Sequence, residues 1–387
     1  MNEPINEPIR VMRIIARMNV GGPAVQITGL MRTMNSTEFN QRLYTGFCEE
    51  YETDYLDGVA PDVAAIRIPG LGRKIALFDD IRVLIRLIHV IRVFKPHIIH
   101  THTAKAGFLG RVASILSLYP SLRVHTFHGH LLNGYFSRLK RGLLIFVERI
   151  LARHTHQLIA VGAKVQFDLI NAGIGIHSKF IVMPPGLQIG PLLEKTTARE
   201  LLGVDVTKVQ VAYIGRVTAI KRPDRFLEVV ERVHQKNVNV QFFIAGDGDL
   251  IANCATKIKE SHLPVRLLGM QTNIDLVLSA ADIVLLTSDN EGTPLCLIQA
   301  GMAGLPVIST DVGSVSEIVL NEVSGIVTSC RIDDLATAVE RLINDESLRM
   351  AMGSQGKEFT LKNFGVPRLV TDHENLYKEL IANQARS

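Results

Sequence analysis

The chain has 387 residues and a formal net charge of +4, and this length favours two domains over one. Its hydrophobic content of 47% argues against disorder and predicts a well-buried mixed α/β protein. No apolar run approaches the roughly 18–20 residues of a membrane-spanning helix, which argues against an integral membrane protein.

The charge is unevenly distributed along the chain. Residues 1–190 hold 22 lysines and arginines against 13 acids, whereas the remainder holds 20 against 25. Between Ile81 and Arg153, twelve basic residues accompany a single acid, Glu148. This pattern predicts a localised basic surface on the first half of the protein.

The N-terminus and the cysteines both favour a cytoplasmic protein. The opening MNEPINEPIRVMRI has acids and prolines where a signal peptide has a basic end and an apolar stretch. No CxxC pair occurs, and we expect free, buried thiols in a reducing compartment at Cys48, Cys254, Cys296 and Cys330.

Short apolar runs alternate with helical segments along the first half. Strands are predicted at IRVMRIIARM, QRLYTGFCE, AAIRIPG, PHIIHTHT, LRVHTFHG, THQLIAVG and KFIVMPPG. A helix is predicted at DDIRVLIRLIHVIRVFK, with Arg82, Arg86, His89 and Arg92 spaced along one face. This alternation predicts βαβ units and a parallel sheet.

The pattern restarts after MPPGLQIGPL, with strands predicted at VQVAYIG, VQFFIAG, VRLLG, ADIVLLTS, PVIST and SGIVTS. The predicted fold class is α/β, with two Rossmann-like doubly wound domains facing a cleft, and a ligand at the carboxyl ends of the strands. We expect one domain over residues 1–186 and a second over 187–365. A last helix over 366–387 is expected to pack back on the first domain.

Two cations follow the first strand of the second half. In GRVTAIKRPD, Arg216 comes directly after the strand, Lys221 follows five residues later, and Pro223 suits the first helical position. Such a loop suits a diphosphate, although solvated loop charges would give the same pattern. The next loop, AGDGDL, lacks the third glycine of a dinucleotide fingerprint, and Asp247 and Asp249 have no further metal ligands nearby.

Glu291 lies in SDNEGTPLCLIQAG, between a buried strand and an apolar helix. Free amides at the helix start form an anion site, and a carboxylate there would repel the anion unless it faced another group. Sugar hydroxyls are suitable partners, because an ionised acid accepts strong hydrogen bonds from them. The simpler alternative is a helix N-terminal acid, worth ~0.3–1 kcal/mol.

Histidines cluster near the ends of two strands of the first half. A metal site is one interpretation, but no acid lies between residues 81 and 147 to complete it, and the side chains alternate between strand faces. Recognition of a phosphate, a sugar or a polar acceptor is therefore favoured for this group, which comprises His97, His100, His102, His125, His128 and His130.

Together these motifs resemble the retaining glycosyltransferases of family 4, which have the two-domain B-type fold (GT-B). THTAKAGFLGR and HTFHGH resemble, within them, the subgroup that builds bacterial surface polysaccharides. RMNVGGPAVQI resembles the glycine loop, GRVTAIK the Gly-Arg-x4-Lys phosphate clamp, and SDNEGTPLCLIQAGMAGLPVISTDVGSVSEIV the donor-site signature. The resemblance implies a catalytic set of Glu291, His128, Arg216 and Lys221. It implies donor contacts at Gly21, Gly22, Gly215, Arg216, Lys221, Gly246, Gly269, Glu291, Gly292, Thr293, Pro294, Leu295 and Gln299.

The resemblance also implies a mechanism. Residues 1–186 would form the acceptor side and residues 187–365 would bind a nucleotide diphosphate sugar, with UDP favoured. Glu291 and His128 would hold the transferred sugar, while Arg216 and Lys221 would stabilise the leaving diphosphate in place of a metal ion, so that no cofactor is expected. The family's front-face route retains the anomeric configuration and suits a site with one carboxylate.

One position departs from the family pattern. A second glutamate usually follows the first by eight residues and bonds the nucleotide ribose, and Gln299 stands there instead. An amide can accept one hydroxyl but carries no charge. Donor affinity and nucleotide choice are therefore the open points.

The acceptor is expected on the first domain. Its basic strip suits a lipid-linked phosphate or a glycan, with contacts at His102, Lys105, Arg138, Lys140 and Arg141. The segment GYFSRLKRGLLIFVERILARH mixes aromatic and basic residues as an interfacial helix does, although a solvated basic face on a buried helix remains open. The expected location is cytoplasmic, extending to the inner face of an anionic membrane. Nucleic acid is not expected, because the chain has no tryptophan and no recognised binding module.

Three alternatives remain beside the transferase. A nucleotide-sugar epimerase or hydrolase of the same fold would act on the donor without an acceptor. A non-catalytic nucleotide-sugar-binding partner is suggested by Gln299. A histidine metalloenzyme would carry about one bound metal.

Overall fold

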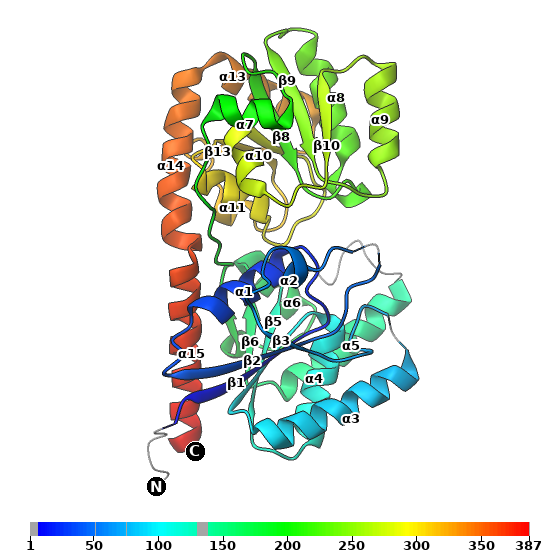
Figure 1. The fold of residues 1–387 in the computed structure, drawn as a ribbon, viewed down its shortest axis with the longest axis vertical. Coiled ribbons are helices and arrows are strands. Elements are labelled where there is room, and N and C mark those ends of the chain that lie inside the picture. Colours follow the sequence, from blue (N-terminus) through cyan, green and yellow to red (C-terminus); the bar gives the residue numbers. More distant parts are fainter. Residues whose placement is uncertain (1–6, 51, 75, 130–137, 387) are drawn as a thin grey trace. The chain divides into compact units, whose positions relative to one another are not determined.

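The computed structural model describes residues 7–50, 52–74, 76–129 and 138–386, without the side chains of residues 138–140. The chain divides into two compact units, Met1–Gly186 with Val366–Ser387, and Leu187–Gly365. Each unit contains one parallel sheet with helices on both faces, as Figure 1 shows, so the predicted α/β fold class with two doubly wound domains is confirmed.

The first unit is built on a seven-stranded sheet in the order β3-β2-β1-β4-β5-β6-β7. All of its strand pairs are parallel. The strands are β1 Ile9–Ile15, β2 Phe39–Thr45, β3 Ala65–Arg67, β4 Ile98–His102, β5 Leu122–Phe127, β6 Gln157–Ala160 and β7 Phe180–Val182. The helices are α1 Gly22–Thr33, α2 Tyr55–Gly58, α3 Leu77–Phe94, α4 Ala104–Leu116, α5 Arg138–Arg153, α6 Ala163–Asn171, the short η1 His177–Lys179, and α15 Val366–Arg386.

Alternate residues of the strands in this sheet bury two different helix layers. Met12 and Ile14 pack with α3 and α4, whereas Val11 packs with α1 and α15. The C-terminal helix α15 thus completes the core of the first unit, because Leu369 and Tyr377 lie in the cluster that contains Val11.

The second unit is built on a six-stranded sheet in the order β10-β9-β8-β11-β12-β13. Its strands are β8 Val209–Ile214, β9 Val240–Ala245, β10 Val265–Gly269, β11 Ile283–Leu286, β12 Val307–Thr310 and β13 Gly325–Thr328. Its helices are α7 Lys195–Leu202, the short η2 Ala219–Lys221, α8 Pro223–His234, α9 Ile251–Glu260, α10 Ile274–Ala280, α11 Leu295–Met302, α12 Val315–Ile318, α13 Ile332–Asn344 and α14 Glu346–Phe364. The order reverses between β8 and β11, which is the switch point where doubly wound folds bind ligands.

The cysteines and the lengths of the apolar helices bear on two further predictions from the sequence. All four cysteines are free, but only Cys254 is fully buried and Cys330 is exposed, so the prediction of four buried thiols was wrong. Cys330 lies in the loop after β13, where no apolar layer covers it. In the described part of the chain, no helix is both long enough and apolar enough to cross a bilayer.

Candidate functional site

Glu291 and Lys221 meet at the carboxyl edge of the second sheet. Lys221 ends η2 in the loop after β8, and Glu291 lies in the loop between β11 and α11. Lys221 Nζ donates to Glu291 Oε1 at 2.5 Å, and Ser288 Oγ donates to the same oxygen at 2.6 Å. Glu291 is 8% exposed, while its other oxygen, Oε2, accepts no hydrogen bond from the described residues. The carboxylate is therefore fixed through one oxygen and keeps the second available as an acceptor.

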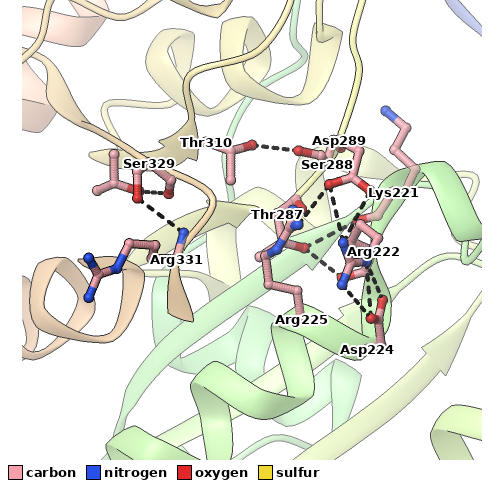
Figure 2. Close-up of polar contacts among 11 residues, drawn as sticks. Lys221, Arg222, Asp224, Arg225, Thr287, Ser288, Asp289, Thr310, Ser329 and Arg331 are labelled. Carbon is pink, nitrogen blue, oxygen red and sulfur yellow. Dashed lines mark hydrogen bonds and ion pairs between the residues drawn. The ribbon is translucent and has the colours of Figure 1, made fainter. Parts of the chain in front are cut away.

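A network of backbone and side-chain bonds locks the two loops together. Asp289 N donates to Ile220 O at 2.9 Å, and Thr287 Oγ1 donates to Arg222 O at 3.0 Å. Arg225 donates to Thr287 O and to Asp289 Oδ1, each at 2.7 Å. Figure 2 shows Asp289 between Arg222 and Arg225. The network holds Lys221 and Glu291 next to each other although they are far apart in the sequence.

Arg216 differs from Lys221 in having no anionic partner among the described residues. It follows β8, is exposed, and is tethered through its carbonyl, which accepts a hydrogen bond from Tyr213 Oη at 2.8 Å. Its guanidinium is therefore a free cation on the same loop as the Lys221–Glu291 pair. This arrangement suits an anion bound at the loop.

The start of α11 supplies the next part of this edge. The helix begins at Leu295, with Pro294 at the N-cap and no side-chain cap. Pro294 precedes the first helical turn because its φ of −71° and ψ of 105° are extended, not helical. Gly292 and Thr293 stand in the loop before it. The uncapped amides of this turn are suited to an anion.

The glycines of this edge fall into two groups. A Cβ at Gly246 would lie 1.9 Å from Gly215 O, and a Cβ at Gly313 would lie 1.8 Å from Glu291 O, so both positions require glycine for the packing of the chain itself. At Gly215 and Gly269 a Cβ would meet no atom within 4 Å. Open space beside the backbone at these two positions leaves room for a ligand.

Gln299 and Cys296 both lie on α11. Gln299 is partly buried, and its side-chain amide makes no hydrogen bond within the described residues. Burial raises the pKa of the Cys296 thiol to about 11, so it is protonated and not a nucleophile at neutral pH. Gln299 is thus free to bond a ligand, whereas Cys296 belongs to the packing of the helix.

At the carboxyl edge of the first sheet, Gly21 is the N-cap of α1 and Gly22 its first residue. A Cβ at Gly21 would find its nearest neighbour, Asn19 O, 4.0 Å away. The packing of the chain therefore does not explain glycine at residue 21, and the open backbone is suited to a ligand.

A column of histidines ends at the same edge, with His100, His102 and His373 buried and His128 partly buried. His102 Nδ1 and His128 Nε2 are 2.9 Å apart, and the His102 ring stacks on His100 with centroids 4.2 Å apart. His100 Nδ1 bonds Tyr377 Oη at 2.6 Å, and His373 also stacks with His100, with centroids 5.7 Å apart. Burial lowers the pKa of His128 to about 3 and that of His102 well below its ordinary value, so both rings are neutral.

The structure distinguishes the expected acceptor contacts. Lys105 Nζ is held by Asp80 Oδ1 at 2.7 Å, by Gly70 O at 3.0 Å and by the carbonyl of Lys74. It therefore ties the loop after β3 to α4, which the sequence did not reveal. Arg141 is exposed at the start of α5. The side chains of Arg138 and Lys140, like all of His130, lie outside the described residues.

Sequence reasoning missed several residues of the two sites. Ser288, Asp289 and Arg225 fix the Lys221–Glu291 pair, and the only signal for them was their place beside the motif residues. Ser314 Oγ is buried without a partner, and the Ser314 amide bonds Gly292 O at 3.0 Å. In the parts of the chain that the structure describes, no group of three or more His, Cys, Asp or Glu could hold a metal ion.

Comparisons with known proteins agree with this two-unit architecture. A family described as glycosyl transferase 4-like domain matches residues 21–186, and one described as glycosyl transferases group 1 matches residues 194–359.

Relatives of known function match most of the chain. The UDP-Gal:alpha-D-GlcNAc-diphosphoundecaprenol alpha-1,3-galactosyltransferase of Escherichia coli is 29% identical over 342 residues, covering 86% of this chain and 87% of its own. The capsular polysaccharide biosynthesis glycosyltransferase CapM of Staphylococcus aureus is 24% identical over 331 residues, covering 80% of this chain and 83% of its own.

Among solved structures, Anabaena Alr3699/HepE in complex with UDP superimposes with a TM-score of 0.81. The match covers 96% of this chain and all of the other, at 18% identity, and so concerns the fold. Because both halves match glycosyltransferase families, the chain belongs to the GT-B glycosyltransferases, with a glycosyl transferase 4-like domain followed by a group 1 glycosyl transferase domain.

Proposed function

We propose that this protein transfers a glycosyl unit from a UDP-sugar to a lipid-linked or polysaccharide acceptor in bacterial surface-polysaccharide synthesis. The observation that carries the proposal is the Glu291 carboxylate, held by Lys221 and Ser288 beside the free cation Arg216 and the uncapped start of α11. Support for the substrates comes from the name of the E. coli relative, which gives a UDP-sugar donor and a diphosphoundecaprenol-linked acceptor.

The arrangement divides two tasks between charges of opposite sign. The free Oε2 of Glu291 would accept hydrogen bonds from hydroxyls of the transferred sugar. Arg216, Lys221 and the amides at the start of α11 would stabilise the negative charge that develops on the leaving diphosphate, without a metal ion. Lys221 would remain anchored by Glu291 while its remaining N–H groups face the phosphates.

The resemblance to family 4 extends the proposal to retention of the anomeric configuration and to His128 as a contact of the transferred sugar. A double-displacement hydrolase uses two carboxylates flanking the bond. At the described edge of the second sheet, Asp289 is engaged by Arg222 and Arg225, and Asp247, Asp249 and Asp311 are exposed, whereas Glu291 is buried and keeps a free oxygen. One carboxylate favours the front-face route, in which the leaving phosphate assists deprotonation of the acceptor.

The test is transfer from UDP-galactose to a GlcNAc-diphospho-polyprenol, with UDP-glucose, UDP-GlcNAc and GDP-mannose as further donors. NMR of the product's anomeric coupling reports retention or inversion. Glu291→Gln and Lys221→Ala are expected to lower kcat by about 100-fold or more, because both act on charge in the transition state. Glu260→Gln on the exposed end of α9 is the matched control.

The outcomes separate the alternatives. Donor cleavage or epimerisation without an acceptor would favour an epimerase or hydrolase. Binding of UDP-sugars without turnover over all acceptors would favour a non-catalytic binding partner. Unchanged transfer by both site variants would overturn the assignment of the site.

A further inference from the structure

Helix α3 carries a row of exposed apolar side chains. Leu77, Ile81 and Ile85 are 72%, 46% and 62% exposed. They recur every four residues, so they form one stripe along the helix. Arg82 and Arg86 follow in the adjacent row and are exposed as well. Large apolar residues in a continuous exposed stripe mark an interaction surface more often than singly scattered ones do.

Helix α5 repeats the pattern. Leu143, Phe146 and Ile150 are 66%, 59% and 41% exposed and lie three and four residues apart. Arg141 and Arg153 are exposed on the same helix. Thus each helix presents an apolar row bordered by arginines.

The two helices lie on the same face of the first sheet, on either side of α4. Both contact α4, and Figure 1 shows α3, α4 and α5 as neighbouring helices. Helix α4 and the residues after it add exposed Phe108, Leu116 and Leu118. We call the exposed residues of α3, α4 and α5 the basic–apolar face.

The charges of this face are one-sided. The three helices contain only three acids, and each is paired: Asp79 with Arg82, Asp80 with Lys105, and Glu148 with Arg111. The Arg111–Glu148 pair is buried, with both side chains 1% exposed.

Five exposed arginines of these helices remain without an acidic partner among the described residues, namely Arg86, Arg92, Arg141, Arg149 and Arg153. The face is therefore positively charged around its apolar rows. An anionic surface complements it.

We infer that the basic–apolar face docks on an anionic lipid membrane. The apolar rows would enter the boundary between headgroups and acyl chains, and the arginines would bond lipid phosphates at the same depth. Sequence reasoning placed an interfacial helix on the segment that contains α5 and gave acceptor or membrane-side contacts at His102, Lys105, Arg138, Lys140 and Arg141. The structure adds the exposed apolar row of α3. The inference goes beyond the proposed reaction, since docking is measured without turnover.

A second copy of the chain is a poorer occupant. In a twofold dimer the same patch meets itself, so unpaired arginines of one copy would face those of the other. Like charges at an interface are repulsive, and no unpaired acid of these helices would offset them.

The experiment is co-sedimentation of the full-length protein with vesicles of phosphatidylglycerol and phosphatidylcholine, against vesicles of phosphatidylcholine alone. Binding is expected only with the anionic vesicles, and it should weaken as salt is raised. The triple variant Leu77→Gln, Ile81→Gln, Ile85→Gln should reduce binding on the order of 100-fold, because three side chains no longer insert. Arg86→Gln and Arg141→Gln should each reduce it about fivefold.

The matched control changes three apolar residues of the second unit to glutamine, namely Leu201, Val238 and Met350, which are 65%, 76% and 69% exposed. It should bind vesicles as the parent does. Equal loss in both triple variants, equal binding to neutral vesicles, or a dimer in light scattering that the α3 variant dissolves would each overturn the inference. Because the changed side chains are exposed, the melting temperature of each variant is expected to stay the same and shows whether it has folded.

Discussion

Lys221 and Glu291 form the ion pair on which the second unit's site depends. Lys221 is 17% and Glu291 8% exposed at the side chain, so neither charge is fully hydrated. A nearly buried charge that loses its partner is strongly destabilising, whereas removing both charges together is tolerated better.

The first prediction follows from this pair. Lys221→Met should lower the free energy of unfolding by about 3 kcal/mol, since it leaves the Glu291 carboxylate with only Ser288. In the double variant Lys221→Met, Glu291→Leu, the free energy of unfolding should fall by less than the sum of the decreases in the two single variants. Urea denaturation of the four proteins measures the coupling, and strictly additive losses would contradict it.

Gln299 offers a second prediction at the residue scale. Its amide is free, and a carboxylate there would make stronger hydrogen bonds to a ribose than a neutral group does. Gln299→Glu should therefore tighten UDP binding by about fivefold, while stability stays unchanged. Isothermal titration with UDP checks this, with Gln235→Glu on the exposed end of α8 as control. Unchanged or weaker binding would mean that Gln299 does not contact the nucleotide.

His102 determines which nitrogen of His128 carries the proton. His102 Nε2 is buried without a partner, and an orphaned N–H is rarer than an orphaned acceptor. The His102 proton is therefore expected on Nδ1, donating to His128 Nε2, which leaves the proton of His128 on its own Nδ1. His128 would then meet a ligand as a hydrogen-bond donor.

The third prediction tests this tautomer. In ¹⁵N-histidine NMR, His128 should show a protonated Nδ1, and His102→Asn should preserve it because the asparagine amide is also a donor. His102→Leu removes the donor to His128 Nε2, so the His128 proton should no longer be confined to Nδ1. A His128 ring protonated on Nε2 in the parent protein would refute the assignment.

At the scale of elements, the turn between η2 and α8 holds Arg222 at a φ of +51°. A left-handed conformation costs a non-glycine residue about 1–2 kcal/mol. The Arg222 guanidinium is 31% exposed and pairs with Asp224 and Asp289, and screened pairs of this kind contribute about 0–1 kcal/mol. The strain is therefore of the same order as the combined gain from the two ion pairs.

This comparison gives the fourth prediction. Arg222→Gly should leave the free energy of unfolding unchanged or raise it by up to about 1 kcal/mol. Arg222→Ala should lower it, because it keeps the strain and loses the ion pairs. Thermal unfolding of the two variants side by side is the measurement, and a more stable alanine variant would show that the strain is unimportant.

At the scale of the whole molecule, buried neutral histidines make the first unit sensitive to acid. Burial lowers the pKa of His373 to about 3, and burial also lowers the pKa values of His100, His102, His125 and His128. The unfolded chain binds protons near pH 6.5 while the folded unit does not. Stability is therefore complete above pH 6.5 and falls as the pH drops below it.

The fifth prediction is that each of these histidines removes up to about 1.4 kcal/mol of stability for every pH unit below 6.5. Urea denaturation between pH 7.5 and 5.5 measures the slope for the parent protein. His373→Leu should reduce this slope by the contribution of one proton, which is up to about 1.4 kcal/mol per pH unit. A flat stability profile would show that the folded histidines take up protons over the same pH range as the unfolded chain, so that their pKa values are not lowered.

Much of the fold could be predicted from the sequence, because apolar runs separated by helical segments determine βαβ units locally. The strand at VQVAYIG, the helix that starts at Pro223 and the amphipathic C-terminal helix all follow from patterns within a few residues. The motif glycines and the acid Glu291 could also be found, since each lies within a few residues of the end of a predicted strand.

The contacts that decide the chemistry were set only by the tertiary structure. The bond from Lys221 to Glu291 spans 70 residues, and the bond from His100 to Tyr377 spans 277. The contacts of Lys105 with Asp80 and with backbone carbonyls appeared only in the structure, and its role as an acceptor contact stays a prediction. Periodicity reports which residues share a face of one element, whereas a contact between elements depends on sheet order and loop geometry, which no local pattern encodes. The sequence by itself therefore determined the two doubly wound units and the residues at their strand ends, and only the tertiary structure decided which of these residues are paired and which remain free.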